Sequence, residues 1–331
     1  MTGSRRTVRN IATAVLTLLL PACDGAPSAL EPRGPGAARI ESLWWLIFWI
    51  SAAVFLVVLG FLLVAAGRGL RTAVRVDREV RWGDRFVVVS GVVVPAIILI
   101  AVFVVSLQDM AALSRTGRST TLTIDVVSHD WWWEARYPDQ TVTANEIHIP
   151  VGEPVRLRLL TDDVIHSFWV PQLQGKTDHV TGRTNQMWLE ADEPGRYRGQ
   201  CAEFCGLQHA NMAFFIVAEP MDEFQTWLTD NARSAAVGAS SEDAGLDVFM
   251  TTTCAGCHAI RGTPADAQVG PDLTHLAQRE TLLAGTIANT RANLATVITS
   301  PQSLKPGVGM PPTELSGDEL DALVDYLERL E

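Results

Sequence analysis

The segment from residue 201 to 212 carries the strongest chemical signal in the chain. It holds Cys201, Cys205, His209 and Met212, with Glu203 between the two cysteines. Thiolates, imidazoles and thioethers are soft or borderline donors, which favour copper, zinc or iron–sulfur clusters over magnesium or calcium. Four such donors at short spacing predict a transition-metal site rather than a loop with an incidental histidine.

A second motif, Cys254-Ala-Gly-Cys257-His258, has the C-x-x-C-H spacing of covalent haem attachment. In such a site both thiols form thioethers to the haem, and the histidine binds iron. A methionine as the second axial ligand raises the potential. Met310 is the only methionine after the motif, so it is the predicted sixth ligand. A thioredoxin-type C-x-x-C is the alternative, and a histidine directly after the motif argues against it.

Two uncharged apolar segments, 43–67 and 86–107, must position these motifs. About twenty helical residues cross the roughly 30 Å hydrocarbon layer of a membrane. The segments therefore predict two transmembrane helices. Buried helices of a large soluble protein are the alternative, but such helices are usually shorter.

The loop between the two segments indicates how the chain is oriented. Its basic residues are Arg68, Arg71, Arg75, Arg78, Arg81 and Arg85, against the acidic Asp77, Glu79 and Asp84. Short loops rich in arginine stay on the cytoplasmic side. Everything after Leu107 is thus expected outside the inner membrane of a bacterium, on the periplasmic or outer side.

Charge is divided unevenly along the chain. The part through Leu107 has 11 basic and 6 acidic residues, and the remainder has 15 and 31. An acidic external part argues against a nucleic-acid partner. It suits the attraction of a basic protein partner, although a merely solubilising surface would look similar.

Residues 1–23 are typical of an export signal, with three arginines followed by a short apolar run. The run ends in Leu20-Pro21-Ala22-Cys23, which resembles a lipoprotein cleavage box with Cys23 as the lipidated residue. A plain signal peptide, or an uncleaved segment, is the alternative. Residues 24–42, rich in Pro, Gly and Ala, are expected to form a linker. Each of the five cysteines has a use other than a disulfide, so no disulfide is predicted.

The region 118–229 has the pattern of short β-strands. Alternating or β-branched runs occur at 120–127, 141–149, 153–160, 187–190 and 214–218, separated by turn signals. They predict an all-β Greek-key sandwich. His166 is expected to close a strand within it, well before Cys201.

An early histidine from the sheet and a late Cys/His/Met loop are the arrangement of copper ligands in cupredoxins. The pattern resembles the dinuclear copper A centre of cytochrome c oxidase subunit II, a family that also has two preceding membrane helices. The resemblance implies that Cys201 and Cys205 bridge two coppers, with His166 and His209 as one imidazole ligand each. One zinc held by two cysteines and two histidines is the physical alternative.

The resemblance assigns further roles within this loop and upstream of it. Met212 would be a weak axial ligand, and Glu203 would offer its backbone carbonyl to copper and its side chain to a magnesium shared with subunit I. Trp131, in the run Trp131-Trp132-Trp133, matches the electron entry point that faces cytochrome c. Simple packing of these aromatics under the sheet is the alternative. Glu79 matches the family's proton-entry glutamate poorly.

The C-terminal part follows a small, polar linker at 230–241. Residues 242–331 are expected to form an all-α class I cytochrome c domain with one covalent haem. Gly270-Pro271 resembles the segment whose proline carbonyl orients the haem histidine. Ser316 and Glu319 have the spacing of a capping box at the start of the last helix.

Together these features resemble subunit II of a proton-translocating haem–copper cytochrome c oxidase with a fused cytochrome c domain. The resemblance implies subunits I and III as partners and cytochrome c, or the chain's own haem, as the electron donor. Electrons would pass through copper A to the haem of subunit I, where oxygen is reduced to water, so this chain would have no catalytic residue of its own. The copper A subunit of a nitric oxide reductase and a free-standing membrane-anchored electron carrier are the alternatives.

Overall fold

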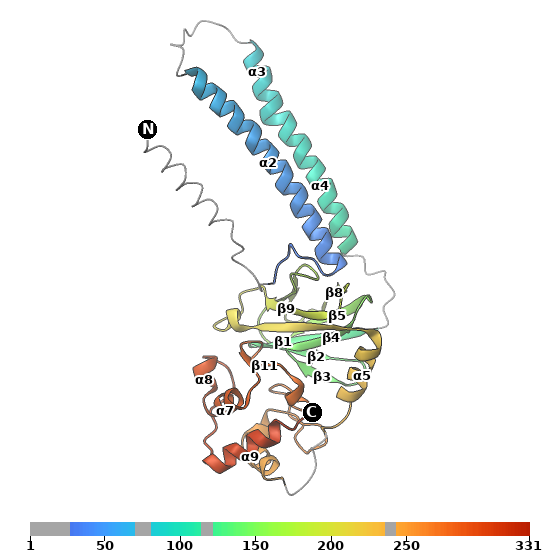
Figure 1. The fold of residues 1–331 in the computed structure, drawn as a ribbon, viewed down its shortest axis with the longest axis vertical. Coiled ribbons are helices and arrows are strands. Elements are labelled where there is room, and N and C mark those ends of the chain that lie inside the picture. The colour runs from blue at the N-terminus through green and yellow to red at the C-terminus, as the bar shows by residue number, and fades with distance from the viewer. Residues whose placement is uncertain (1–26, 70–80, 114–121, 236–242) are drawn as a thin grey trace, which may run out of the picture.

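The computed structural model describes residues 27–69, 81–113, 122–235 and 243–331. It has three parts in chain order: a hairpin of two long helices, a β-sandwich and a small helical domain (Figure 1). This confirms the predicted order of fold classes. The predicted export signal, with Cys23, and most of the arginine-rich loop lie outside the described residues.

The hairpin consists of α2 (Pro35–Gly69) and a second helix made of α3 (Arg81–Val88), a π-helical turn (Val89–Val93) and α4 (Val94–Leu113). Both helices are long and apolar enough to cross a membrane, and the most apolar stretch of each helix is not buried by the rest of the structure. This fits a membrane anchor. The π-helical turn ends two residues before Pro95, whose missing N–H disrupts the regular hydrogen-bond pattern.

Helix α2 begins inside the segment that was expected to be a linker, so that expectation was wrong for residues 35–42. Pro35 suits the first turn of a helix, and the alanines that follow are strong helix formers. The start of the helix is also fixed on the sandwich, because the Ala37 N–H donates to the Leu173 carbonyl at 3.0 Å. Hydropathy alone marks where the apolar run begins and not where the helix begins.

The sandwich has two five-stranded sheets. The first, in the order β3-β2-β1-β5-β8, contains β1 (Thr123–His129), β2 (Trp132–Arg136), β3 (Val142–Ala144), β5 (Val155–Thr161) and β8 (Asn185–Leu189). The second, in the order β4-β10-β9-β6-β7, contains β4 (Glu146–Pro150), β10 (Ala213–Glu219), β9 (Gly195–Cys201), β6 (His166–Trp169) and β7 (Thr177–His179). The core between the sheets includes Trp133, Phe168 and Phe214, which are fully buried.

One feature of the sheet differs from the expectation. His166 opens strand β6 instead of closing a strand. The preceding residues form a bend in which the Thr161 hydroxyl donates to the Asp163 carboxylate at 3.1 Å. This local hydrogen bond competes with strand pairing and leaves His166 at the end of the sheet, where a loop can reach it.

The C-terminal domain packs short helices around an apolar interior. Its elements are α6 (Ala244–Thr251), η3 (Cys254–Gly256), η4 (Leu276–Gln278), β11 (Thr281–Leu282), β12 (Ile287–Ala288), α7 (Arg291–Thr299), α8 (Pro301–Leu304) and α9 (Gly317–Leu327). Helices α6 and α9 approach so closely that a Cβ on Gly245 would lie 2.2 Å from the Ala322 carbonyl oxygen. The capping box of Ser316 and Glu319 is present at the start of α9.

Helix α5 (Met221–Asn231) lies along the side of the sandwich and leads into the C-terminal domain (Figure 1). It extends through residues 230–231 of the expected linker. The C-terminal domain is seated at the end of the sandwich opposite the helix hairpin. The sandwich therefore separates the proposed membrane anchor from the domain that carries the C-x-x-C-H motif.

Candidate metal centres

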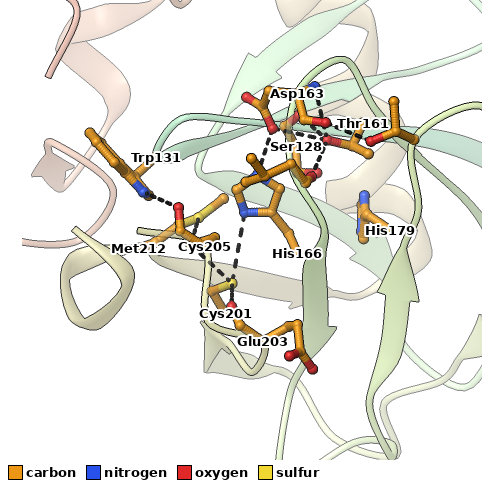
Figure 2. A network of polar contacts seen from close by, with 12 residues as sticks. Ser128, Trp131, Thr161, Asp163, His166, His179, Cys201, Glu203, Cys205 and Met212 are labelled. Atoms are coloured by element: carbon orange, nitrogen blue, oxygen red, sulfur yellow. Dashed lines mark hydrogen bonds and ion pairs between the residues drawn. The ribbon is translucent and has the colours of Figure 1, made fainter. Parts of the chain in front are cut away.

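The predicted ligands of the first centre meet at one end of the second sheet. Figure 2 shows His166, Cys201, Glu203, Cys205 and Met212 there, and His209 lies beside Cys205. Strands β6 and β9 are antiparallel neighbours, with Phe168 opposite Cys201. His166 begins β6 and Cys201 ends β9, so the pairing brings the two side chains together. The loop after Cys201 then returns through a short 3-10 turn, His209–Asn211, into β10.

The donor atoms lie at the separations that shared metal ions require. The sulfur atoms of Cys201 and Cys205 are 3.7 Å apart. His166 Nδ1 is 3.9 Å from the Cys201 sulfur, and His209 Nδ1 is 3.7 Å from the Cys205 sulfur. Met212 Sδ is 3.8 Å from the Cys205 sulfur. Two ligands at about 2.0–2.3 Å from one tetrahedral ion stand about 3.3–3.8 Å apart. The residues therefore fit soft metal ions bound between them.

The two groups of Glu203 point in different directions, as Figure 2 shows. Its backbone carbonyl oxygen lies 3.3 Å from the Cys201 sulfur, at the edge of the donor cluster. Its carboxylate is partly exposed and lies 3.3 Å from the Lys176 ammonium. The backbone can thus serve the metal centre while the side chain faces away from it.

A carboxylate orients His166. The Asp163 carboxylate accepts a hydrogen bond from His166 Nε2 at 2.7 Å, which leaves Nδ1 toward Cys201. Burial lowers the pKa of His166, but the bond to Asp163 and the contact with Cys201 outweigh it and raise that pKa to about 9. A histidine whose second ring nitrogen is held by a carboxylate in this way is typical of metal sites.

The Asp163→Asn variant should lower copper affinity by about 10- to 100-fold, the usual cost of losing the carboxylate that holds a metal-bound histidine in place. Copper retained per chain during titration with a chelator measures the effect. Asp162→Asn, at the neighbouring position in the same bend, is the matched control and should behave as the parent. Equal copper retention in Asp163→Asn and the parent would show that the carboxylate does not support the ligand.

The two thiols do not ionise independently. A hydrogen bond from Cys205 lowers the pKa of Cys201, whereas the neighbouring thiolate and burial raise the pKa of Cys205. One thiolate forms readily, and a second one beside it is opposed by charge repulsion. Metal cations between the sulfurs would remove that repulsion, because thiolate is the form that binds metal.

The three consecutive tryptophans have different surroundings. Trp133 is fully buried in the core, whereas Trp132 stacks on His129 at a ring separation of 4.3 Å. Trp131 donates its indole N–H to the Cys205 carbonyl at 2.9 Å. The packing interpretation thus holds for Trp133. Trp131 directly contacts the loop of residues 201–212 that carries most of the proposed copper ligands, called the metal loop below.

The second centre is an apolar cavity in the C-terminal domain, with a volume of about 270 Å³. Cys254, Cys257, His258 and Met310 all line it. Its remaining walls are mostly apolar, with contributions from Phe249, Leu276, Leu294, Val297, Ile298, Leu323 and Leu327. An apolar cavity with two thiols, an imidazole and a thioether on its walls fits a covalently attached haem.

The imidazole of His258 is fixed in the orientation that a haem ligand needs. The Pro271 carbonyl lies 2.7 Å from His258 Nδ1, so Nε2 is the nitrogen available to iron. A Cβ on Gly270 would lie 2.6 Å from His258 Cε1, and this close approach leaves no space for a side chain there. Burial lowers the pKa of His258 and so favours the neutral form that binds metal.

The four remaining described histidines, His129, His148, His179 and His275, each contact a carboxylate or a backbone carbonyl. Sequence reasoning missed two residues near the sites, Asp163 and Lys305. Asp163 has a weak signal, because it lies three positions before His166. The only sequence signal for Lys305 is the rarity of its residue type, because the chain contains two lysines among its 26 basic residues.

Comparison with known proteins gives a consistent picture. The family model for the periplasmic domain of cytochrome c oxidase subunit II matches residues 140–219, and the model for cytochrome c matches residues 242–331. A cytochrome c oxidase subunit 2 from Alkalihalophilus pseudofirmus is 37% identical over 97% of this chain and 96% of its own length. The subunit of the same name from Bacillus subtilis is 31% identical over 96% of both chains.

Two further similarities are more partial. A quinol oxidase subunit 2 from Bacillus spizizenii is 29% identical and matches 68% of this chain and 72% of its own length. The crystal structure of the periplasmic domain of subunit II of cytochrome oxidase from Bradyrhizobium japonicum shares 30% identity. It covers 34% of this chain and 95% of that chain, with a TM-score of 0.33.

Proposed function

This chain belongs to the cytochrome c oxidase subunit II family, and we propose that it carries electrons from cytochrome c, through a dinuclear copper A centre, to the haem of subunit I. The family membership and the two domains imply binding of copper A and haem c. A bound copper A centre supplies one-electron transfer with little change in geometry. The protein contributes ligand position, shielding from water and a contact surface.

The observation that carries the proposal is the placement of the two imidazoles around the two thiols. His166 Nδ1 lies beside Cys201, and His209 Nδ1 lies beside Cys205. Among the described residues, two groups have donor atoms that all lie within 4.8 Å of one another, and neither includes His209: His166, Cys201 and Cys205, and Asp130, Asp163 and His166. A single tetrahedral zinc would need all four donors within about 3.8 Å of one another. The arrangement favours two metal ions with the thiolates between them.

Beside this centre, Met212 and the Glu203 carbonyl are proposed as the weak axial ligands. Met212 is fully buried with its sulfur toward the thiols, which suits a ligand held by packing. The Glu203 carboxylate is proposed to bind a magnesium shared with subunit I. Its partial exposure supports a role toward a partner chain.

The C-terminal domain is proposed to hold one haem c through Cys254 and Cys257, with His258 and Met310 as axial ligands. The contact of the Pro271 carbonyl with His258 supports this ligand orientation. The donor of electrons is then an external cytochrome c, the fused haem, or both in series. Trp131 is the proposed entry residue, since its indole contacts the Cys205 carbonyl.

The proposed location is the bacterial inner membrane, with both metal domains on the periplasmic or outer side. The two apolar helices and the arginine-rich loop between them support this orientation. Subunits I and III are the proposed partners, and subunit I performs the reduction of oxygen coupled to proton translocation. A nitric oxide reductase would present a different large subunit, and a free-standing carrier would purify alone. The relative matched over nearly the whole chain favours the oxidase.

Metal analysis of the complex purified from membranes tests the proposal. We expect two coppers and one covalently bound haem iron in each copy of this chain, with the delocalised copper signal in electron paramagnetic resonance. One copper, or zinc in place of copper, would refute the dinuclear centre. Mass spectrometry of the co-purifying large subunit separates the oxidase from a nitric oxide reductase.

A further inference from the structure

Lys305 lies between the sandwich and the C-terminal domain and is almost completely buried, with 3% of its surface exposed. Its ammonium group donates to three backbone carbonyls. Two belong to the sandwich, Trp131 at 2.9 Å and Asn211 at 2.8 Å, and the third is Leu283 of its own domain at 3.0 Å. One side chain thus bonds both domains beside the metal loop.

The residue type fits this position. An ammonium has three N–H donors on a compact head, which matches three convergent carbonyls. The guanidinium of arginine is a planar fork that suits carboxylates instead. This chain uses lysine at only two of its 26 basic positions, and one of them is here. A buried cation without hydrogen-bond partners would be strongly destabilising, so the three bonds are needed to hold Lys305 in place.

The carbonyl of Leu283 belongs to the tip of the β11–β12 hairpin, which enters the interface. Leu283, Ala284 and Gly285 have backbone φ angles of 54°, 60° and 74°. Positive φ is unfavourable for a bulky residue such as leucine and persists where the surroundings hold it. The Ala284 carbonyl accepts from the Ala213 N–H at 3.0 Å, so the tip bonds the start of strand β10. The strained tip is thus stabilised by its contacts with the sandwich.

Other contacts surround this junction. Gln208 donates its side-chain N–H to the Pro306 carbonyl at 2.6 Å, next to Lys305. At the outer edge, Arg196 of the sandwich pairs with Glu280 of the C-terminal domain at 3.4 Å, and the Glu280 side chain is 69% exposed. The contacts of Lys305 and Gln208 therefore lie at the metal loop, whereas the exposed ion pair lies away from it.

The junction also closes the haem cavity. Asp130, Trp131 and Trp132 of the sandwich line the same cavity as Cys257 and Met310. A Cβ on Gly307 would lie 2.9 Å from Leu207 and 3.7 Å from the Trp131 ring, so the loop before Met310 is in contact with the metal loop. Trp131, which is half-buried, is therefore partly covered by the chain's own C-terminal domain.

We propose that Lys305 and the hairpin tip Leu283–Gly285 form an interdomain lock that seats the fused cytochrome domain on Trp131. In the seated state the fused haem is the donor at this face, and a soluble cytochrome c reacts at the outer surface of the fused domain. The inference rests on the proposed function. Lys305 also lines the haem cavity. It is a positioning residue in the proposal, since it acts by holding the domain.

Hydrogen exchange of the Ala213 amide in the purified complex tests the lock without reference to activity. In the parent this amide should exchange slowly, at a rate close to that of core strand amides. Exchange as fast as that of an exposed amide would overturn the proposal. Lys305→Met keeps the side-chain length and removes all donors, so Ala213 exchange should rise by about tenfold or more.

Two further variants calibrate this result. Lys305→Gln keeps two N–H donors and should show a smaller increase. Glu280→Ala removes the exposed interdomain ion pair and should change exchange by less than about threefold, because exposed pairs contribute little. Arg329→Met, which removes a cation paired with Asp243 inside the same domain, should leave Ala213 exchange unchanged. Equal exchange in Lys305→Met and Arg329→Met would refute the lock.

The dipolar effect of ferric haem on copper spin relaxation adds a distance-sensitive readout, and it should weaken in Lys305→Met. Haem-to-copper electron transfer within the complex should slow by about tenfold or more, because tunnelling falls steeply when the domains separate. The comparison requires that the spectra of the parent and of Lys305→Met show both the haem and the copper centre. Loss of the copper signal in the parent would contradict the proposed function itself, whereas intact cofactors with unaltered exchange and relaxation in Lys305→Met would contradict only the lock.

Discussion

Replacing Cys205 by serine should abolish the dinuclear copper signal and lower electron transfer from cytochrome c to oxygen by about 100-fold or more. Cys205 contacts most of the proposed ligands, since its sulfur lies within 3.8 Å of the donor atoms of Cys201, His209 and Met212. A serine hydroxyl is a hard, neutral donor that cannot bridge two coppers as a thiolate does. Copper per chain, the paramagnetic signal and turnover of the purified complex measure the effect.

Ala210→Ser is the matched control, because it introduces the same hydroxyl at an exposed position of the same loop. It should retain both coppers and the parent turnover. The haem spectrum should be unchanged in both variants, since the cytochrome cavity has its own ligands. Two coppers and a parent-like signal in Cys205→Ser would show that the second thiolate is not a bridge.

The candidate metal loop could be proposed from the sequence because its donors lie close together along the chain. Spacing from Cys201 to Met212 is a local property, and so is the C-x-x-C-H motif. His166 was harder, because it depends on the pairing of β6 with β9. The expectation that it closes a strand was wrong, although the structure still brings its side chain to the loop.

Strand boundaries show where a local pattern fails. The run 141–149 alternates as one strand would, but the structure divides it into β3 and β4, which belong to different sheets. The break is Asn145, with a φ angle of 64°, whose side chain accepts the Trp133 N–H at 2.9 Å. Asparagine tolerates this conformation better than most residues. The hydrogen bond from the distant Trp133 N–H fixes the break at Asn145, and it cannot be predicted from the alternation of apolar and polar residues.

Interdomain contacts are the part that sequence reasoning could not reach. Lys305 bonds the carbonyl of Trp131, far away in the chain, and no spacing rule connects the two. The same holds for the tryptophans. Trp131 and Trp133 are two positions apart, so they would share a face if both belonged to one strand. Trp131 instead precedes strand β2 and lies in the interface, whereas Trp133 lies inside the sandwich. Parity predicts a common face only within one strand.

Met310→Ala should remove the sixth haem ligand and lower the haem potential by on the order of 0.1–0.2 V, while the haem stays covalently attached through Cys254 and Cys257. The side chain of Gln302 shapes the loop that presents Met310, since it donates to the Val308 carbonyl at 2.7 Å and accepts from the Gly307 N–H at 2.7 Å. The backbone should therefore keep its course without the thioether. A potentiometric titration followed by absorption measures the shift.

The domain supplies its own control for this variant. Met250, in helix α6, is the other methionine of the domain, and it precedes the C-x-x-C-H motif too closely to reach the opposite face of the haem. Met250→Ala should keep the parent potential and spectrum at some cost in stability, because it only removes packing. Since a thioether ligand raises the potential, Met310→Ala should also make the haem a stronger reductant toward copper A but harder to reduce by the external donor. An unchanged spectrum in Met310→Ala would exclude this residue as a ligand, and the sixth position would then belong to another group of the cavity.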